Sequence, residues 1–201
     1  PRAFGDAHFV TVDGRNYTFN GIGHFVLADS SDWTIGIALS PMGDGSVPNG
    51  LALLDKASGT TYEVHPGDGI SGIVVYIDGV ALVLPVNTAV TPYSLGNITI
   101  HYDFRELHLT WPAFGIAAGL WYESASATTG VGGSTNYLQY ELSIEKSRYS
   151  GNLSGLLGNF NGDPADDLRA PEAEVGDIGL PWNASLEEIH FDFAMKWQLD
   201  L

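Results

Sequence analysis

The sequence predicts an all-β fold, a two-sheet antiparallel β-sandwich with short helical turns. The chain carries 25 Gly and 10 Pro. Between them lie short runs of β-branched and aromatic residues, a pattern typical of strands joined by tight turns. With 201 residues, the chain can build one hydrophobic core that buries roughly 70% of its unfolded surface. We therefore expect one domain over residues 1–201, belonging to a larger protein.

Two hairpins are indicated by turn dipeptides, Asn20-Gly21 and Asp78-Gly79. Both dipeptides accept the positive φ angles of a type I′ turn. The flanking runs that we expect to pair are 17–19 with 22–27 and 73–77 with 80–84.

Other apolar or alternating runs predict further strands, most of them five to eight residues long. They are 8–12, 33–39, 61–64, 98–102, 107–111, 115–122 and 137–144. Two segments, 41–49 and 126–135, have too few apolar groups to pack, and we expect both to be mobile loops.

The C-terminal region carries two competing signals. Ser185 and Glu188 have the spacing of a helix capping box. The residues that follow alternate strictly between apolar and polar or small side chains from Ile189 to Leu199, which favours a strand. We expect a short helical turn and then a final strand that buries its aromatic face.

A late loop groups five oxygen-bearing side chains within nine residues. They are Asn159, Asn161, Asp163, Asp166 and Asp167. Calcium takes six to eight oxygen ligands from such groups, so the loop is suited to Ca²⁺ near the C-terminus. The later spacing is not that of an EF-hand, and no bidentate Glu closes the loop. The alternative is an ordinary Asn-Gly-Asp-Pro turn with solvated carboxylates.

Charge and motif content exclude several classes of function. Eight Lys and Arg against 24 Asp and Glu give a net charge of −16, which repels nucleic acid and anionic membranes. No apolar run approaches the roughly 18 to 20 residues that span a bilayer, so we expect no direct membrane insertion. The six histidines show no His-X-X-X-His pair, and no nucleophile elbow is present. We therefore expect a protein that is not an enzyme.

Four Asn-X-Ser/Thr sequons indicate an extracellular or cell-surface glycoprotein. Their asparagines are Asn16, Asn97, Asn152 and Asn183. The chain has no cysteine, which a domain of this size tolerates because its core is sufficient without disulfides. Any oligomer must then be non-covalent.

Both ends of the chain carry long motifs. The chain opens with Gly5-Asp6-Ala7-His8-Phe9-Val10-Thr11-Val12-Asp13-Gly14, continued by Arg15-Asn16-Tyr17-Thr18-Phe19-Asn20-Gly21, and closes with the run 155–167. The opening run resembles the start of a von Willebrand factor type D (VWD) domain. The closing run resembles that family's Gly-Leu-Cys-Gly-Asn-Phe/Tyr-Asn-Gly motif and its paired acidic residues, with Leu157 in the cysteine position. A terminal Trp such as Trp197 is also usual. The resemblance is greatest to the cysteine-free D domain of a membrane-bound mucin and its sushi-domain relatives.

The resemblance implies a calcium site that joins the late loop to the first hairpin. Carried over by position, the side-chain ligands would be Asp13, Asn159, Asn161, Asp166 and Asp167, with the backbone carbonyl of Asp163 as a further oxygen. Without the family, Asp13-Gly14 is an ordinary turn. Three formal negative charges would then face one Ca²⁺.

Some members of the family cut themselves at a Gly-Asp-Pro-His motif, which here is Gly5-Asp6-Ala7-His8. An Asp carboxyl attacks its own carbonyl there, and proline nitrogen is the leaving group. Ala7 removes that leaving group. Our hypothesis is that the motif, Asp6 and His8 included, is vestigial and that this chain does not self-cleave.

The function that we expect is a non-catalytic, calcium-binding structural and interaction module. Its partners would be neighbouring domains of the same parent protein, and other extracellular proteins or glycans. One alternative is a self-processing module cut after Asp6. Another is a carbohydrate-binding sandwich, in which exposed tryptophans stack on sugar rings, although burial is the usual fate of such rings. The tryptophans considered are Trp33, Trp111, Trp121 and Trp182.

Overall fold

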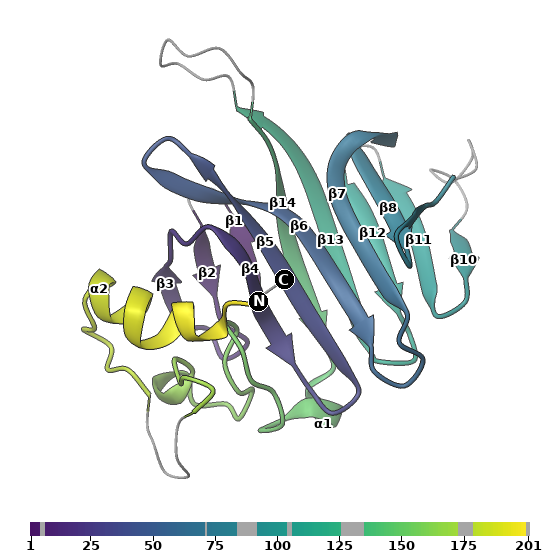
Figure 1. Ribbon diagram of the computed structural model, residues 1–201. Helices are drawn as coiled ribbons and strands as arrows, with labels where there is room; N and C mark the ends of the chain where they lie inside the picture. Colours follow the sequence, from purple (N-terminus) through teal and green to yellow (C-terminus); the bar gives the residue numbers. More distant parts are fainter. Residues whose placement is uncertain are drawn as a thin grey trace.

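The computed structural model describes residues 1–4, 7–70, 72–83, 92–103, 106–125, 135–172 and 179–199. Two antiparallel sheets lie face to face (Figure 1). The order of the eight-stranded sheet is β10-β11-β12-β13-β14-β1-β2-β3, and that of the six-stranded sheet is β4-β5-β6-β7-β8-β9. The predicted all-β sandwich is confirmed.

The eight-stranded sheet combines the two ends of the strand series. It consists of β1 (Arg2–Phe4), β2 (His8–Val10), β3 (Asn16–Thr18), β10 (Tyr93–Leu95), β11 (Ile98–Asp103), β12 (Glu106–Trp111), β13 (Ile116–Ala125) and β14 (Thr135–Ile144). The six-stranded sheet consists of β4 (Gly23–Asp29), β5 (Trp33–Met42), β6 (Gly45–Asp55), β7 (Thr61–Ile70), β8 (Ile73–Ile77) and β9 (Val80–Ala81). All seven additional strand predictions coincide with described strands.

The core lies between the sheets because strand residues alternate between the inner and outer faces. β12 shows this directly, with Leu107, Leu109 and Trp111 buried and the residues between them half-buried. The Trp111 ring meets Tyr62 of the opposite sheet at a centroid distance of 6.2 Å. Leu157, in the position where the family carries cysteine, is fully buried in the same core.

Only one of the two predicted hairpins exists. Asp78 and Gly79 have φ angles of 51° and 73° and join β8 to β9, as a type I′ turn requires. Asn20-Gly21 instead connects β3 to β4, which belong to different sheets. The tight packing of Phe19 over Gly21 leaves no room for a side chain there, so this glycine serves a close approach and not a hairpin turn.

The prediction of a mobile loop over 41–49 is wrong. β5 extends to Met42 and β6 begins at Gly45, with the two strands paired from Met42 opposite Gly45. The polar and Gly residues of this segment form a tight Gly43-Asp44 turn at the end of a hairpin, and the residues on either side are paired. The second expected loop, 126–135, lies outside the described residues except for Thr135, which begins β14.

The predicted C-terminal strand is also wrong. The capping box is present, since Ser185 and Glu188 bond to each other's backbone in both directions. The chain then stays helical through α2 (Leu186–Glu188), a π-helical segment η2 (Ile189–Phe193) and a 3₁₀ segment η3 (Ala194–Trp197). Ile189 and Phe193, four residues apart, are buried, whereas Phe191 is 59% exposed. The buried residues therefore follow the four-residue spacing of a helix and not the two-residue alternation of a strand.

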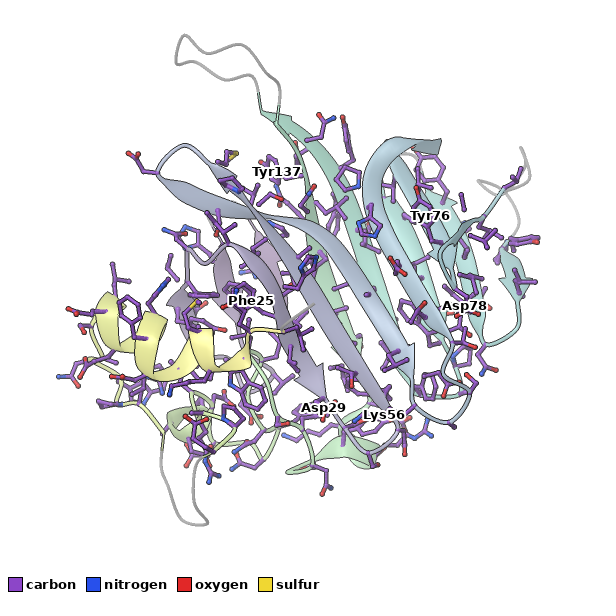
Figure 2. The ribbon with its side chains drawn as sticks, in the orientation of Figure 1. Phe25, Asp29, Lys56, Tyr76, Asp78 and Tyr137 are labelled. Carbon is purple, nitrogen blue, oxygen red and sulfur yellow. The ribbon has the colours of Figure 1, made fainter. Side chains whose placement is uncertain are left out.

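Segments after β14 gather at one end of the sandwich. The late loop with the 3₁₀ turn η1 (Pro164–Asp166) and the C-terminal helices lie beside β2, β3 and β4 (Figure 1). Helix α1 (Lys146–Tyr149) packs Tyr149 against Trp33 at the start of β5. Ser154 and Asp29 exchange backbone hydrogen bonds of 2.8 and 3.1 Å, which fixes the late segment to the edge of β4. Figure 2 shows Asp29 near Lys56, whose Nζ lies 2.9 Å from its carboxylate. No helix in the described ranges is long and apolar enough to cross a membrane.

Candidate metal centre

The turn between β2 and β3 lies directly against the late loop. The backbone N–H of Val12 donates to the carbonyl of Leu157 at 2.9 Å. Thr11 Oγ1 donates to Asp167 Oδ2 at 2.5 Å, and Arg15 N donates to Thr11 Oγ1 at 2.8 Å. Residues about 150 positions apart are thus held together by hydrogen bonds of their own.

The late loop is shaped by a relay of side chains bonded to the backbone. Asn159 Oδ1 accepts from Asn161 N at 3.1 Å, and Asn161 Oδ1 accepts from Asp163 N at 2.6 Å. Asp163 Oδ1 in turn accepts from Ala165 N at 3.0 Å and caps η1. These are the local turns that Asn and Asp favour. Asn161 and Asp163 are exposed, so the turn explanation considered above fits these two residues.

Two carboxylate oxygens at this junction are buried without a hydrogen bond to any described residue. They are Asp13 Oδ2 from the first turn and Asp166 Oδ1 from the late loop. Buried polar atoms are nearly always paired, so two unpartnered acceptors of the same charge indicate room for a cation. The other oxygen of Asp166 accepts from Asn161 Nδ2 at 2.9 Å.

Asp167 is the central carboxylate of the junction and is 2% exposed. Burial raises its pKa to about 6, and the nearby charges of Asp13 and Asp166 add to this rise. The hydrogen bonds from Thr11 and from Asn159 N, the latter at 3.3 Å, lower the pKa but do not cancel the effect. Asp13 and Asp166 are thus close enough to Asp167 to influence its ionisation.

Stability in chelator should therefore fall as pH rises from about 4 to about 6. In this range the folded state binds a proton at Asp167 that the unfolded state, with a pKa near 3.9, has already lost. The contribution is complete below pH 4 and disappears above pH 6. We expect the stability of wild type relative to Asp167→Asn to fall by about 2 kcal/mol across this range. Urea unfolding of both proteins at each pH measures it, and parallel curves would contradict the assignment.

The close approach of the late loop depends on Gly158. Its φ is 85°, in the left-handed region that favours glycine. A Cβ at this position would collide with the Asp167 carboxylate. The glycine therefore allows Asp167 to turn inward toward Thr11.

Arg15, which is 2% exposed, was not among the predicted site residues. Its guanidinium donates to the carbonyls of Ala165 at 3.1 Å, Leu180 at 2.7 Å and Pro181 at 2.6 Å. It also lies 5.1 Å from the centre of the Trp182 ring. Burial lowers the pKa of Arg15, and the charge of Asp167 opposes that shift. An Arg directly after an Asp-Gly turn is the only sequence signal for this contact.

The predicted ligands divide into two groups. Asp13, Asn159, Asp166 and Asp167 belong to the junction, whereas Asn161 and Asp163 lie on the exposed side of the loop. Within the described ranges, no three His, Cys, Asp or Glu side chains form a group able to hold a metal by themselves. A cation here would need amide or carbonyl oxygens as well, which calcium accepts.

The motif at 5–8 is described only in part, because Gly5 and Asp6 lie outside the described residues. Ala7 is fully buried and has a φ of 46°. Proline fixes φ near −65°, so a proline does not fit this backbone conformation. His8 Nδ1 lies 2.8 Å from Thr18 Oγ1.

The sequon asparagines and the tryptophans considered for sugar stacking differ in exposure. The asparagines of all four sequons are exposed. Trp33 and Trp111 are buried at 0% and 2% exposure, so the idea that they stack on sugars is wrong; both fill the core. Trp121 is half-buried, and Trp182 is 62% exposed but covers Arg15.

Comparison with known proteins gives distant relatives over nearly the whole chain. No family model matches it. Mucin-4 of Homo sapiens is 27% identical over 98% of this chain and 4% of that protein, and Mucin-4 of Mus musculus is 26% identical over 98% and 6%. Human Sushi domain-containing protein 2 is 27% identical over 97% of the chain and 22% of its own length. The chain thus spans less than a quarter of these curated relatives. The similarity places it among extracellular and cell-surface proteins.

Proposed function

We propose that this chain is a VWD-type module that binds Ca²⁺ and serves as a structural and interaction unit of an extracellular, mucin-like glycoprotein. The observation that carries the proposal is the pair of unpartnered buried oxygens, Asp13 Oδ2 and Asp166 Oδ1, beside the buried carboxylate of Asp167. They come from two segments far apart in sequence. The resemblance of both segments to the VWD family supports the same site.

The donor set selects a hard cation. Asp13, Asp166 and Asp167 offer carboxylate oxygens, and Asn159 offers an amide oxygen, with no sulfur or imidazole among them. Ca²⁺ prefers such ligands and tolerates irregular geometry, whereas Mg²⁺ demands a near-ideal octahedron. Burial is the main cause of the raised pKa of Asp167, and a divalent ion would offset the repulsion from Asp13 and Asp166 that adds to it.

Ion binding would fix the relative positions of segments that are distant in the sequence. The turn after β2 and the late loop would be held at a fixed distance, and so would the backbone segments that Arg15 bonds. Since the relatives are much longer than this chain, the surfaces fixed in this way are suited to neighbouring domains of the parent protein. All four sequon asparagines are exposed, in keeping with a glycoprotein.

Calcium titration of Asp13→Asn tests the proposal. The variant removes one formal charge from the junction, and we expect its calcium affinity to fall by at least about tenfold, or 1.4 kcal/mol. Asp44→Asn is the matched control because Asp44 is exposed in the β5–β6 turn. Isothermal titration calorimetry measures the affinity of both variants and the wild type.

Thermal melting supplies the second readout. Calcium at a hundred times its Kd should stabilise the wild type by about 2.7 kcal/mol. The gain should shrink in Asp13→Asn and persist in Asp44→Asn. A wild-type melting temperature that is the same in calcium and in chelator would refute the calcium site.

A further inference from the structure

Two histidines stand side by side on the outer face of the eight-stranded sheet. His101 of β11 is directly opposite His108 of β12. Their ring centroids are 5.8 Å apart with an interplanar angle of 29°. Both are half-buried, and the side chain of His108 keeps 40% exposure. The pair is thus formed by strand register and remains open to solvent.

A groove borders His108 on the side of β12 away from His101. Opposite His108 on the next strand is Gly119. Small residues on β13 form the floor of a groove of about 450 Å³ that is bordered by His108 and Glu141. Glu106 leans over Gly119, where any side chain would collide with its carboxylate.

Glu106 also holds the His108 ring. It lies two residues before His108 on the same face of β12, and its Oε2 is 3.4 Å from His108 Nε2. Metal-binding histidines commonly donate one ring N–H to a carboxylate, which directs the lone pair of the other nitrogen toward the metal. Because Nε2 of His108 faces Glu106, Nδ1 is the ring nitrogen that is left for a metal.

We propose that His101 and His108 form a two-imidazole site for a borderline-soft divalent cation of the Zn²⁺ class, with Glu106 as the positioning residue. Zn–N bonds of 2.0 to 2.1 Å at a near-tetrahedral angle place two imidazole centroids roughly 5 to 6 Å apart. The observed spacing of 5.8 Å lies in that range. Water completes the coordination, and the net charge of −16 favours cation uptake.

The chain contains a natural control for this geometry. His65 of β7 lies two residues after Glu63, and its Nε2 is 3.2 Å from Glu63 Oε2, with the same 40% side-chain exposure as His108. The neighbouring ring is Tyr76 at 5.7 Å. His65 therefore repeats the His–Glu pair without a second imidazole.

Titration with ZnCl2 in calcium-containing buffer tests the site. We expect one zinc ion per chain in the wild type and at least about tenfold weaker binding in both His101→Gln and His108→Gln. Glu106→Gln should weaken binding by about tenfold through the lost positioning contact, and His65→Gln should leave it unchanged.

Two results would overturn the proposal. One is a wild type that binds no zinc; the other is His65→Gln losing as much affinity as His108→Gln, which would mean non-selective binding to surface histidines. Ring-proton NMR of the wild type provides a readout without substitution, since the resonances of His101 and His108 should shift first. The calcium proposal is independent, because Asp13→Asn should retain zinc affinity.

Discussion

Replacing Arg15 with alanine is expected to lower the free energy of unfolding by about 3 kcal/mol or more. The guanidinium satisfies the carbonyls of Ala165, Leu180 and Pro181. Its removal leaves part-buried acceptors unpaired, opens a cavity beneath Trp182 and takes away a positive charge that interacts with Asp167. Urea unfolding in the presence of calcium measures the loss.

Two further variants test whether the effect of Arg15→Ala comes from its contacts with the carbonyls. Arg15→Lys keeps the charge but not the planar fork that reaches several carbonyls, so its loss should be intermediate. Arg148→Ala removes an exposed guanidinium that lies 3.9 Å from Glu145, and it should change stability by less than about 1 kcal/mol. Equal losses in Arg15→Ala and Arg148→Ala would show that the contacts of Arg15 with the three carbonyls contribute nothing.

Gly158→Ala should have the second large effect, on stability and on calcium affinity together. The new Cβ meets the Asp167 carboxylate, and the backbone keeps a φ of 85° that alanine resists. We expect a loss of about 2 kcal/mol or more in stability. Calcium affinity should fall by at least about tenfold because Asp167 is displaced from Thr11 and from the junction.

Gly162→Ala separates backbone strain from the displacement of Asp167. Gly162 lies in the same loop with a φ of 95°, and the nearest group to its Cβ is the flexible Lys146 Nζ at 3.5 Å. Gly162→Ala should lower the free energy of unfolding through backbone strain, but it should leave the calcium affinity unchanged. Calorimetric titration and urea unfolding of both variants give the comparison, and matching calcium affinities would contradict a role for Gly158 at the junction.

Most strands were predictable because the inner and outer faces of each strand differ in polarity. The Asp78-Gly79 hairpin followed from turn chemistry alone. Asn20-Gly21 carries an equally good local signal, but the choice of sheet for β4 depends on how Phe19 packs, and local sequence does not contain that information. Phe191 likewise completed an alternating pattern, although it is exposed on a helix started by the Ser185 capping box.

The candidate site was likewise predictable only in part. The late loop was visible because its oxygen-bearing residues are close in sequence. Asp13 was predicted as a ligand only from the family resemblance, since no local pattern connects it with a loop about 150 positions away. Arg15 was missed because its partners are backbone carbonyls, which every residue possesses and which therefore leave no mark in the sequence.

The pairing of β1 with β14 has a consequence for biosynthesis. Arg2 lies opposite Glu141, so β1 leaves the ribosome some 140 residues before β14, one of its two partner strands. At about 5 to 20 residues per second, this interval is on the order of ten seconds. Closure of such distant pairs also slows folding. During that time the nascent chain presents open strand edges, and chaperones in the compartment where it folds have a defined target.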